Sequence, residues 1–499
     1  MNLDDNQDRW TGTQIAAVVG ILVAGLAVRL YQIDSEALWY DEISSYGFLS
    51  APTLTEFFDQ ERTLDAAMLP VYFTAEYYWY HLVGESVLAM RLLSLITGMV
   101  TIFVVYMIGR RLYGPWAGAV AALCVAFSKL MIYQSQEIRM YAFVLLFCAI
   151  SAYGLINATA TNKKRWWACT LIANALMLGT HLFAVLFVGA QFAYLLLTRP
   201  RQIKFLVSWA AFHTVAELLA LGWFMTTNFS ALQEHMAWIY KPGLGRLFDA
   251  YYFVYAGSKL DALDLVRHVP LGIPVHHVLG VALCGAAAAF IMYAFATTRR
   301  KVLGQTIPMA DDRLLFMLCW LILPPFALFF LTYAVRPCFV ERYTLYSCFA
   351  LYILAGAGIA KLPQGTVRIT AVILLVIVMA GNLVDLHRPM RPDWRAAAPV
   401  LQELSQDGAA VYSPPNNFKP TIAYYGDLDP DRLFDSEEYL TQALAEARKG
   451  NPVGIAIFEV PGIHEAAEVD KGITASGISA IKHHFPGRWD VYVWQLGNS

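Results

Sequence analysis

The sequence predicts an all-α polytopic membrane protein with a small α/β domain at its C-terminal end. Three observations support this fold class. Hydrophobic residues make up 58% of the 499 residues and charged residues only 15%, well below the roughly 25% of an ordinary soluble domain. Apolar runs of bilayer-spanning length recur through residue 386. Beyond residue 386, the pattern changes to amphipathic helices such as SEEYLTQALAEARKG and short strands such as PVGIAIFEV.

Apolar runs predict most of the transmembrane helices directly. They lie at about 13–32, 86–109, 115–133, 140–160, 205–226, 273–297, 313–335, 346–361 and 367–386. The 33 residues between Arg165 and Arg199 would form a single helix of about 50 Å, which exceeds a hydrocarbon core of about 30 Å. Two shorter helices that turn at Gly179–His181 fit better, so we expect about eleven spans.

The distribution of basic residues predicts the orientation, because Lys and Arg concentrate in cytoplasmic loops. The first run follows an acidic start and lacks a small-residue cleavage site, so we expect a retained anchor with its N-terminus inside. Every basic cluster then falls on the cytoplasmic side: Arg110–Arg111, Lys163–Arg165, Arg199–Lys204, Arg299–Lys301 and Lys361 with Arg368. The external side receives loop helices at about 33–85 and 227–272, and the α/β domain at 387–499. Residues 1–386 form the transmembrane domain.

Composition excludes several classes of partner. The net charge is −2, and no block of like charge indicates binding to nucleic acid. The seven cysteines contain no CxxC spacing, so neither a disulfide framework nor a cysteine metal site is expected. The chain has no Gly-rich phosphate loop, so nothing indicates nucleotide hydrolysis.

An acidic pair, Asp41–Glu42, follows the first span within the sequence LWYDEISSY. Aromatic residues around it, Trp39, Tyr40 and Tyr46, favour a position at headgroup depth. Partial desolvation there raises the pKa of a carboxyl group, which makes it a better proton acceptor. The pair is therefore a candidate general base, and an ordinary interfacial loop is the alternative.

Two arginines on the external side are candidate phosphate ligands. Arg139 lies in the turn QSQEIRMY, and Arg342 begins the span that follows RPCFVE. A guanidinium fork can stabilise charge that develops on a leaving phosphate oxygen. Arg139 could instead extend its charged end to the interface beside an apolar stem. Neighbouring candidates for phosphate or substrate contacts are Lys129, Glu137, Tyr141 and Tyr343.

Histidines supply two further candidates. His181 lies in the external turn between the two short helices, where an imidazole could contact a phosphate or, with Glu137, a divalent cation. Two scattered ligands leave the metal requirement open. His213 and Glu217 share one face of a predicted span at spacing i and i+4, which suggests that they pair with each other inside the bundle.

An ordered set of segments gives the chain a family resemblance over roughly residues 10–400. These are LWYDEISSY, PVYFTAEYYWYHLVGESVLAMRLLSLITG, IGRRLYG, YQSQEIRMYA, GTHLFAVLFVGAQ, ERYTLYSCFALYILAGAG and DWRAAA. In this order they resemble the bacterial membrane glycosyltransferases related to protein O-mannosyltransferases and to the lipid A aminoarabinose transferase. Many relatives read Asp and then His-Pro-Pro where this chain has Asp65–Pro70, so contacts from that loop are not transferred.

The resemblance implies a GT-C fold and an enzyme of the bacterial inner membrane. Such an enzyme moves a sugar from a polyprenyl-phosphate donor to an acceptor hydroxyl at the periplasmic face, with inversion at the anomeric carbon. It implies a role in acceptor activation for Asp41, with Glu42 beside it, and donor-phosphate contacts for Arg139 and Arg342. Tyr40 and His181 are expected to contact substrate.

A polyprenyl-phosphate donor requires the kinds of residue found here, a carboxylate and arginines. The phosphate is a good leaving group, so the reaction needs a base and cations but no strong general acid. One alternative is a transporter or flippase of lipid-linked sugars, which would carry polar residues through several spans. Another is a membrane polysaccharide polymerase or ligase with a diphosphate-linked donor. The acceptor expected for such an enzyme is a lipid, a glycan or a protein.

Overall fold

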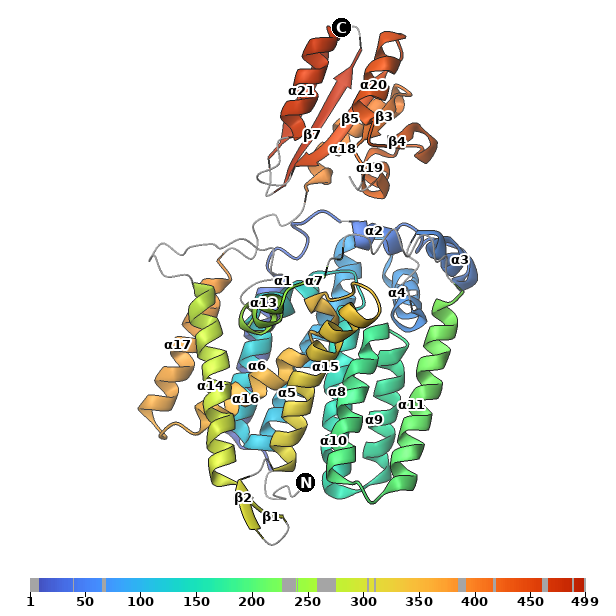
Figure 1. Cartoon of the computed structure of the whole chain (residues 1–499). Coiled ribbons are helices and arrows are strands. Elements are labelled where there is room, and N and C mark those ends of the chain that lie inside the picture. The colour runs from blue at the N-terminus through green and yellow to red at the C-terminus, as the bar shows by residue number, and fades with distance from the viewer. Residues whose placement is uncertain are drawn as a thin grey trace. The chain divides into compact units, whose positions relative to one another are not determined.

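The computed structural model describes residues 9–38, 40–64, 69–226, 239, 241–257, 275–302, 305–308, 311–384, 392–415, 419–459, 465–486 and 489–497. The chain forms two compact units (Figure 1). The bundle unit comprises Met1–Tyr31 and Pro52–Leu386, and the C-terminal unit comprises Gln32–Ala51 and His387–Ser499.

Apolar helices make up most of the bundle unit. They are α1 (Gly12–Leu30), α5 (Val87–Tyr113), α6 (Pro115–Phe127), α7 (Lys129–Gln136), α8 (Tyr141–Thr161), α9 (Lys164–Leu178), α10 (Val185–Thr198), α11 (Ile203–Phe224), α14 (Val275–Thr297), α15 (Asp312–Ala334), α16 (Ser347–Ala360) and α17 (Thr366–Asn382). Among the described residues, six helices are long and apolar enough to cross a membrane, and α6 with α7, bent by 59°, gives a seventh. The predicted multi-pass, mostly helical membrane protein is confirmed.

The expected number of about eleven spans is larger than the six or seven helices of spanning length in the described part of the chain, because it also counted apolar segments that form shorter helices. Apolar helices of 10–17 residues cover Leu182–Thr198, Ser347–Ala360 and Thr366–Asn382. The division of the region between Arg165 and Arg199 into two helices is confirmed, since α9 ends at Leu178 and α10 begins at Val185.

Small residues let the central helices approach one another closely. A Cβ on Gly109 of α5 would lie 2.8 Å from the Cα of Gly118 on α6, and one on Gly356 of α16 would lie 2.6 Å from the carbonyl oxygen of Ala117. Backbone approach of this kind is how helices associate without a hydrophobic driving force between them. These glycines therefore hold α6 between α5 and α16.

Short helices lie at the ends of the spans. The bundle unit contains α3 (Leu54–Leu64), α4 (Pro70–Val83), η2 (Leu182–Ala184), α13 (Leu244–Asp249), the π-helical η3 (Ala250–Tyr255), η4 (Glu341–Thr344) and a hairpin of β1 (Arg299–Val302) and β2 (Gln305–Pro308). Of the helices expected in the loop at 227–272, α13 and η3 are seen, while 227–238, 240 and 258–272 fall outside the described residues.

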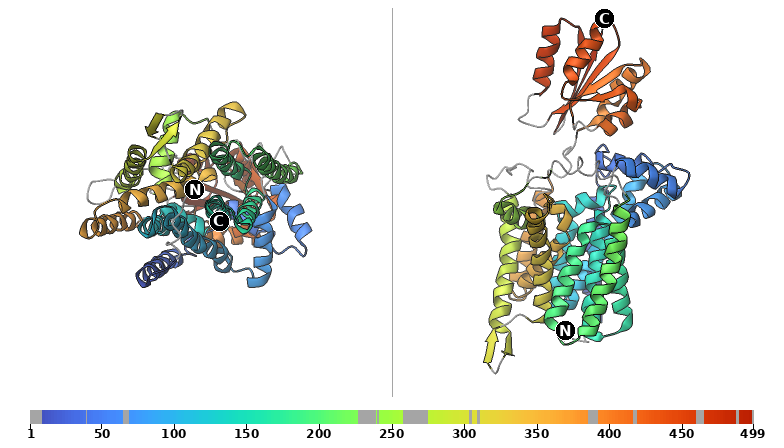
Figure 2. Two further views of the ribbon diagram at one scale, coloured as in Figure 1. Left: turned by 90° about the horizontal axis from the view of Figure 1, so that it is seen from below. Right: turned by 45° about the vertical axis from the view of Figure 1, so that its right-hand side comes forward.

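The C-terminal unit is a mixed five-stranded sheet between two layers of helices (Figure 2). Its strands are β3 (Ala410–Ser413), β4 (Leu433–Asp435), β5 (Val453–Glu459), β6 (Ala480–Phe485) and β7 (Asp490–Leu496), in the order β4-β3-β5-β7-β6. Strand β3 pairs in parallel with β4 and β5, whereas β7 pairs antiparallel with β5 and β6. The small α/β character is confirmed, as are the strands predicted in AAVYSPP, PVGIAIFEV and WDVYVWQLG, which are β3, β5 and β7; β4 and β6 were not predicted.

Alternating apolar residues give this sheet a core on each face. One core joins Trp394 and Leu401 of α18 (Trp394–Gln406), and Ile422 of α19 (Lys419–Gly426), to Val491 and Val493 of β7. The other core lies under α20 (Tyr439–Arg448) and α21 (Glu465–Ser476), and η5 (Pro430–Arg432) precedes β4. The unit also includes α2 (Tyr40–Tyr46), which packs against α19.

Candidate functional site

Five of the predicted site residues lie together at one end of the bundle unit. The ring of His181 lies 5.8 Å from that of Tyr141 and 5.2 Å from that of Tyr343, measured between centroids. The Arg342 guanidinium lies 5.7 Å from the Tyr141 ring. The charges of Arg342 and Arg139 both act on the His181 imidazole. Arg139, Tyr141, His181, Arg342 and Tyr343 therefore form one arginine–histidine cluster from three distant parts of the sequence.

Hydrogen bonds to backbone groups hold the turns that carry this cluster. The Ser94 hydroxyl of α5 donates to the Glu137 carbonyl at 2.6 Å, which fixes the turn before Arg139. The backbone N–H of Val71 in α4 donates to the Gly179 carbonyl at 3.0 Å, beside the His181 turn. The Tyr346 hydroxyl donates to the Phe183 carbonyl at 2.9 Å. Each turn is thus tied to a helix distant in sequence.

Burial and positive charge keep His181 neutral. Its side chain is 7% exposed. Desolvation, together with the smaller effects of the nearby Arg342 and Arg139 charges, lowers the pKa of His181 to about 3. Charging an imidazole in such surroundings is unfavourable for both reasons. The same positive field, with Arg139 only 5% exposed, favours a bound anion.

The basic residues predicted to be cytoplasmic lie at the opposite end of the bundle unit. Arg110, in the last turn of α5, donates to the Arg9 carbonyl ahead of α1 at 3.1 Å. Arg199, after α10, donates to the Thr159 carbonyl at the end of α8 at 3.2 Å. Helix α8 begins at Tyr141 in the cluster and ends at Thr161. One spanning helix therefore separates the two ends.

The acidic pair lies in the C-terminal unit, in the first turn of α2. Asp41 and Tyr40 are half-buried, whereas Glu42 is fully buried at 0% exposure. Tyr46 packs edge-on against Tyr424, with 6.1 Å between ring centroids. Trp39, which we expected to anchor this segment at headgroup depth, falls outside the described residues.

Lys129 and Glu137 flank the short helix α7. Lys129 begins the helix, is 5% exposed, and donates its backbone N–H to the Gly257 carbonyl at 3.2 Å. Glu137, 3% exposed, follows the last residue of α7. The eight residues of α7 separate Lys129 from the Arg139 turn by about 12 Å at about 1.5 Å per residue.

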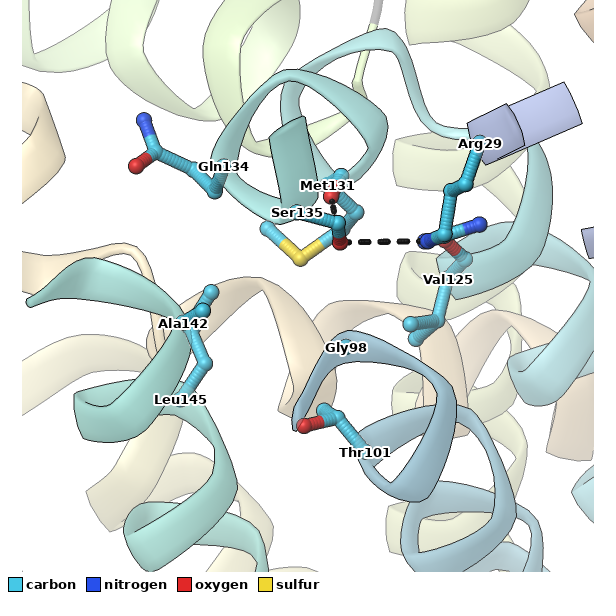
Figure 3. Close-up of a pocket in the computed structure, with 9 residues that line it drawn as sticks. All are labelled: Arg29, Gly98, Thr101, Val125, Met131, Gln134, Ser135, Ala142 and Leu145. Atoms are coloured by element: carbon cyan, nitrogen blue, oxygen red, sulfur yellow. Dashed lines mark hydrogen bonds between the residues drawn. The ribbon is translucent and has the colours of Figure 1, made fainter. Parts of the chain in front are cut away.

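Arg29 is a buried residue that sequence reasoning missed. It lies on α1 and caps the break between α6 and α7, because Nη1 donates to the Ala126 carbonyl and Nη2 to the Val125 carbonyl, both at 2.9 Å. These carbonyls belong to the last turn of α6, which has no helical partner for them. Nε donates to the Ser135 hydroxyl at 3.1 Å (Figure 3). The available signal was an ionisable residue near the end of an apolar run.

The cavity beside Arg29 is too small for a substrate. Its volume is about 10 Å³, and its lining includes Thr101 and Gln134 (Figure 3). A cavity of this size holds about one water molecule. The role of Arg29 is therefore structural: it stabilises the break between α6 and α7, and α7 leads to the Arg139 turn.

The expected pairing of His213 with Glu217 is wrong. The His213 Nε2 instead accepts from the Asn174 amide at 2.9 Å, and its Nδ1 donates to the Trp209 carbonyl at 2.8 Å. Asn174 also donates to Gln191 at 2.8 Å and accepts from Ser151 at 2.5 Å, and Gln191 donates back to Ser151 at 2.7 Å. Asn174 and Gln191 are better partners because they close a ring of hydrogen bonds across α8–α11.

The described residues do not fit a metal centre. Among them, no group of three or more His, Cys, Asp and Glu side chains could hold a metal ion. The pair considered from the sequence, Glu137 and His181, supplies two ligands. His181 also lies in the positive field of Arg342 and Arg139, which disfavours a cation.

Comparison with known proteins gives one family match over part of the chain and a shared fold over nearly all of it. Residues 61–227 match the model of the dolichyl-phosphate-mannose-protein mannosyltransferase family. ArnT from Cupriavidus metallidurans in the apo state superposes with a TM-score of 0.63 at 13% identity, covering 97% of this chain and 98% of that one. The same protein bound to undecaprenyl phosphate gives a TM-score of 0.61 at 14% identity, covering 96% and 97%.

A more distant structural match is the Archaeoglobus fulgidus oligosaccharyltransferase in complex with Zn and sulfate. Its TM-score is 0.51 at 11% identity, covering 88% of this chain and 67% of that one. A comparison with curated proteins finds no match. The resemblance drawn from the sequence is confirmed: this chain has the GT-C fold of ArnT, and its residues 61–227 match the dolichyl-phosphate-mannose-protein mannosyltransferase family.

Proposed function

We propose that this protein transfers a sugar from a polyprenyl-phosphate donor to an acceptor hydroxyl at the periplasmic face of a bacterial inner membrane. The observation that carries the proposal is geometric. The Arg342 guanidinium lies 5.7 Å from the Tyr141 ring, two residues after Arg139, and the His181 ring lies 5.8 Å from the same Tyr141 ring. Two guanidinium groups in a desolvated site are suited to a phosphate that gains charge as it leaves. The match to an ArnT structure with bound undecaprenyl phosphate supports this donor class.

The proposed reaction is a single displacement at the anomeric carbon. The acceptor oxygen forms a bond to this carbon as the bond to the phosphate oxygen breaks. The acceptor proton goes to the Asp41 carboxylate, and the electron pair of the broken bond leaves with the polyprenyl phosphate. Attack opposite the phosphate inverts the configuration. A product with the configuration of the donor would rule this step out.

The environment of each residue suggests its part in this reaction. Asp41 is half-buried, so an acceptor could reach its carboxylate. Glu42 is fully buried, and we assign it a structural role in keeping α2 in place. Neutral His181, with the Tyr141 and Tyr343 rings beside it, gives the phosphate site a polar wall without a third positive charge. Tyr40, Glu137 and Lys129 remain proposed substrate contacts.

The intramembrane polar residues favour catalysis over transport. A transporter of lipid-linked sugars needs polar groups that face a path through the spans. The polar groups of Ser151, Asn174, Gln191 and His213 are buried and bond to one another. They therefore stabilise the packing of α8–α11 and leave little for a passing substrate to bind.

The proposal is tested by donor consumption in purified full-length protein reconstituted in lipid. Radiolabelled polyprenyl-phosphate sugars are supplied singly, and release of free polyprenyl phosphate is followed. We expect Arg139→Gln and Arg342→Gln each to lose about 100-fold or more in rate, since each removes a charged donor to the leaving group. Arg165→Gln, at an exposed site on α9, is the matched control. Normal turnover by the Arg139→Gln/Arg342→Gln double variant would contradict the proposal.

A further inference from the structure

The backbone just before the acidic pair is bound by a tyrosine from the far end of the chain. The backbone N–H of Leu38 donates to the Tyr425 hydroxyl at 2.7 Å, and this hydroxyl donates to the Leu38 carbonyl at 3.5 Å. Tyr425 lies in α19, and Leu38 is 2% exposed. One side chain of the C-terminal unit therefore satisfies both backbone groups three residues ahead of Asp41.

A second residue of the C-terminal unit binds the same segment further upstream. Arg395 of α18 donates through Nη1 to the Asp34 carbonyl at 3.1 Å and through Nη2 to the Glu36 carbonyl. Downstream, the Tyr46 ring packs on Tyr424 of α19. The segment from Asp34 to Tyr46 is thus contacted before, beside and after the acidic pair by α18 and α19.

These contacts matter because the part of the segment ahead of α2 has little regular structure of its own. Residues 35–38 lie outside any helix or strand, and buried backbone groups in such a stretch need partners elsewhere. A stretch held by few backbone bonds opens easily. Removing Tyr425 or Arg395 would therefore loosen the approach to α2.

The hydrogen bond from Tyr425 persists over the physiological pH range. Burial raises the pKa of Tyr425 to about 12, while the bond to Leu38 and the charge of Arg395 act in the opposite direction. The charge of Glu42 also contributes to raising this pKa, which indicates that the buried carboxylate lies near the phenol. The hydroxyl therefore keeps its proton, and Glu42 is near the tyrosine that holds the segment.

We propose that the C-terminal domain is a positioning element of the enzyme, in which Tyr425 and Arg395 hold the 34–46 segment so that Asp41 reaches the acceptor hydroxyl. This inference rests on the proposed function, because it takes Asp41 as the base. Tyr425 is a positioning residue and has no contact with the reacting atoms. The domain then governs acceptor activation, whereas binding of the donor phosphate belongs to the arginine–histidine cluster.

The test uses Tyr425→Phe in the full-length protein in lipid, with Tyr439→Phe as the matched control. Tyr439 donates to Glu465 at 3.3 Å within the same domain, away from the 34–46 segment. We expect kcat to fall about tenfold for Tyr425→Phe, as for loss of one buried hydrogen bond, with the KM for the donor unchanged. Hydrogen exchange should quicken in the peptide covering 36–46 but not in β5 or β7.

A double variant shows whether Tyr425 acts through Asp41. If it does, Tyr425→Phe adds no further loss to Asp41→Asn, because coupled residues are not additive. Arg395→Gln, at an exposed site, removes the second contact without a change in the core and should lower kcat in the same way.

These experiments distinguish a failure of the positioning role from a failure of the proposed transferase function. If Asp41→Asn is inactive while Tyr425→Phe and Arg395→Gln have normal kcat and normal exchange, the positioning role is overturned and the transferase proposal stands. A proportional loss in the double variant also overturns the positioning role, since Tyr425 would then act independently. If Asp41→Asn keeps full activity, the base assignment fails and the inference fails with it.

Discussion

Two guanidinium groups and an imidazole share one end of the bundle unit, and their charges determine what the cluster can bind. Burial and the two arginines depress the pKa of His181 to about 3, so His181 itself adds no positive charge to the cluster at neutral pH. A phosphate monoanion or dianion would stabilise both of them. At the scale of residues, the two arginines are therefore the groups of this cluster that we propose to bind the donor phosphate.

Arginine geometry gives the first prediction at this scale. Replacing Arg139 or Arg342 by Lys keeps the charge but removes the planar fork that can bind two phosphate oxygens at once. We expect donor binding to weaken less than about tenfold while the rate of polyprenyl phosphate release falls by about tenfold or more. Single-turnover release measured at saturating donor checks this. Equal rates for Lys variants and wild type would show that a fork is not needed.

The depressed pKa of His181 gives a second prediction, on stability. Between its folded pKa of about 3 and its unfolded value of about 6.5, the unfolded chain binds a proton that the folded chain does not. This contribution to stability is therefore complete above about pH 6.5 and falls as the pH decreases. From pH 7 to pH 5, His181 alone accounts for about 2 kcal/mol.

Thermal unfolding in detergent checks this contribution. Wild type and His181→Gln are compared at pH 7 and pH 5, and the variant should lose less stability on acidification than wild type. Identical losses in both proteins would mean that His181 titrates normally in the folded state.

The sequence was enough to single out the residues of the cluster as candidates, but not to predict that they lie close together in the fold. Arg139, His181 and Arg342 each stand in a turn on the predicted external side, and their convergence depends on how α8, α9 and η4 pack. Arg29 was missed because an arginine at the end of a span ordinarily extends to the interface. Its actual partners, the carbonyls of Val125 and Ala126, exist only because α6 ends at Phe127.

At the scale of elements, the break between α6 and α7 is the feature that positions the Arg139 turn. The two helices bend by 59° at Ser128, and Arg29 satisfies the carbonyls left open by the bend. Ser135, which accepts from Arg29, lies one residue before the end of α7. The buried cation thus connects α1, α6 and α7.

Replacement of Arg29 by Met tests this connection. The variant leaves two buried carbonyls without their donor, and we expect a loss of about 3 kcal/mol in stability, seen as a lower unfolding temperature in detergent. Arg165→Met, at an exposed site, is the control. Unchanged stability of Arg29→Met would show that other groups satisfy the break.

At the scale of the whole molecule, hydropathy is sufficient to predict the helical membrane part. Strand patterns predict β3, β5 and β7 of the C-terminal sheet but not its edge strands β4 and β6, which are short or mostly polar. The assignment of Gln32–Ala51 to the C-terminal unit was not predictable, because it depends on contacts between residues more than 350 positions apart, such as Arg395 with Asp34. Local sequence carries no signal for such contacts.

The proposed orientation predicts where the C-terminal unit lies. A phosphatase that is active only in the periplasm should be active when fused after residue 499 and inactive when fused after residue 163, in the predicted cytoplasmic loop between α8 and α9. Phosphatase activity in intact cells measures this. The reverse pattern would place the domain, and the acidic pair with it, in the cytoplasm.

The role of Asp41 as the base is tested most directly by the release of free polyprenyl phosphate from a labelled donor. Wild type and Asp41→Asn are compared in lipid with acceptor present. Asp59→Asn, an exposed carboxylate of α3, is the control. We expect wild type and Asp59→Asn to consume one donor, and folded Asp41→Asn to consume it more slowly by about 100-fold or more. Normal turnover by Asp41→Asn would contradict the assignment of the base.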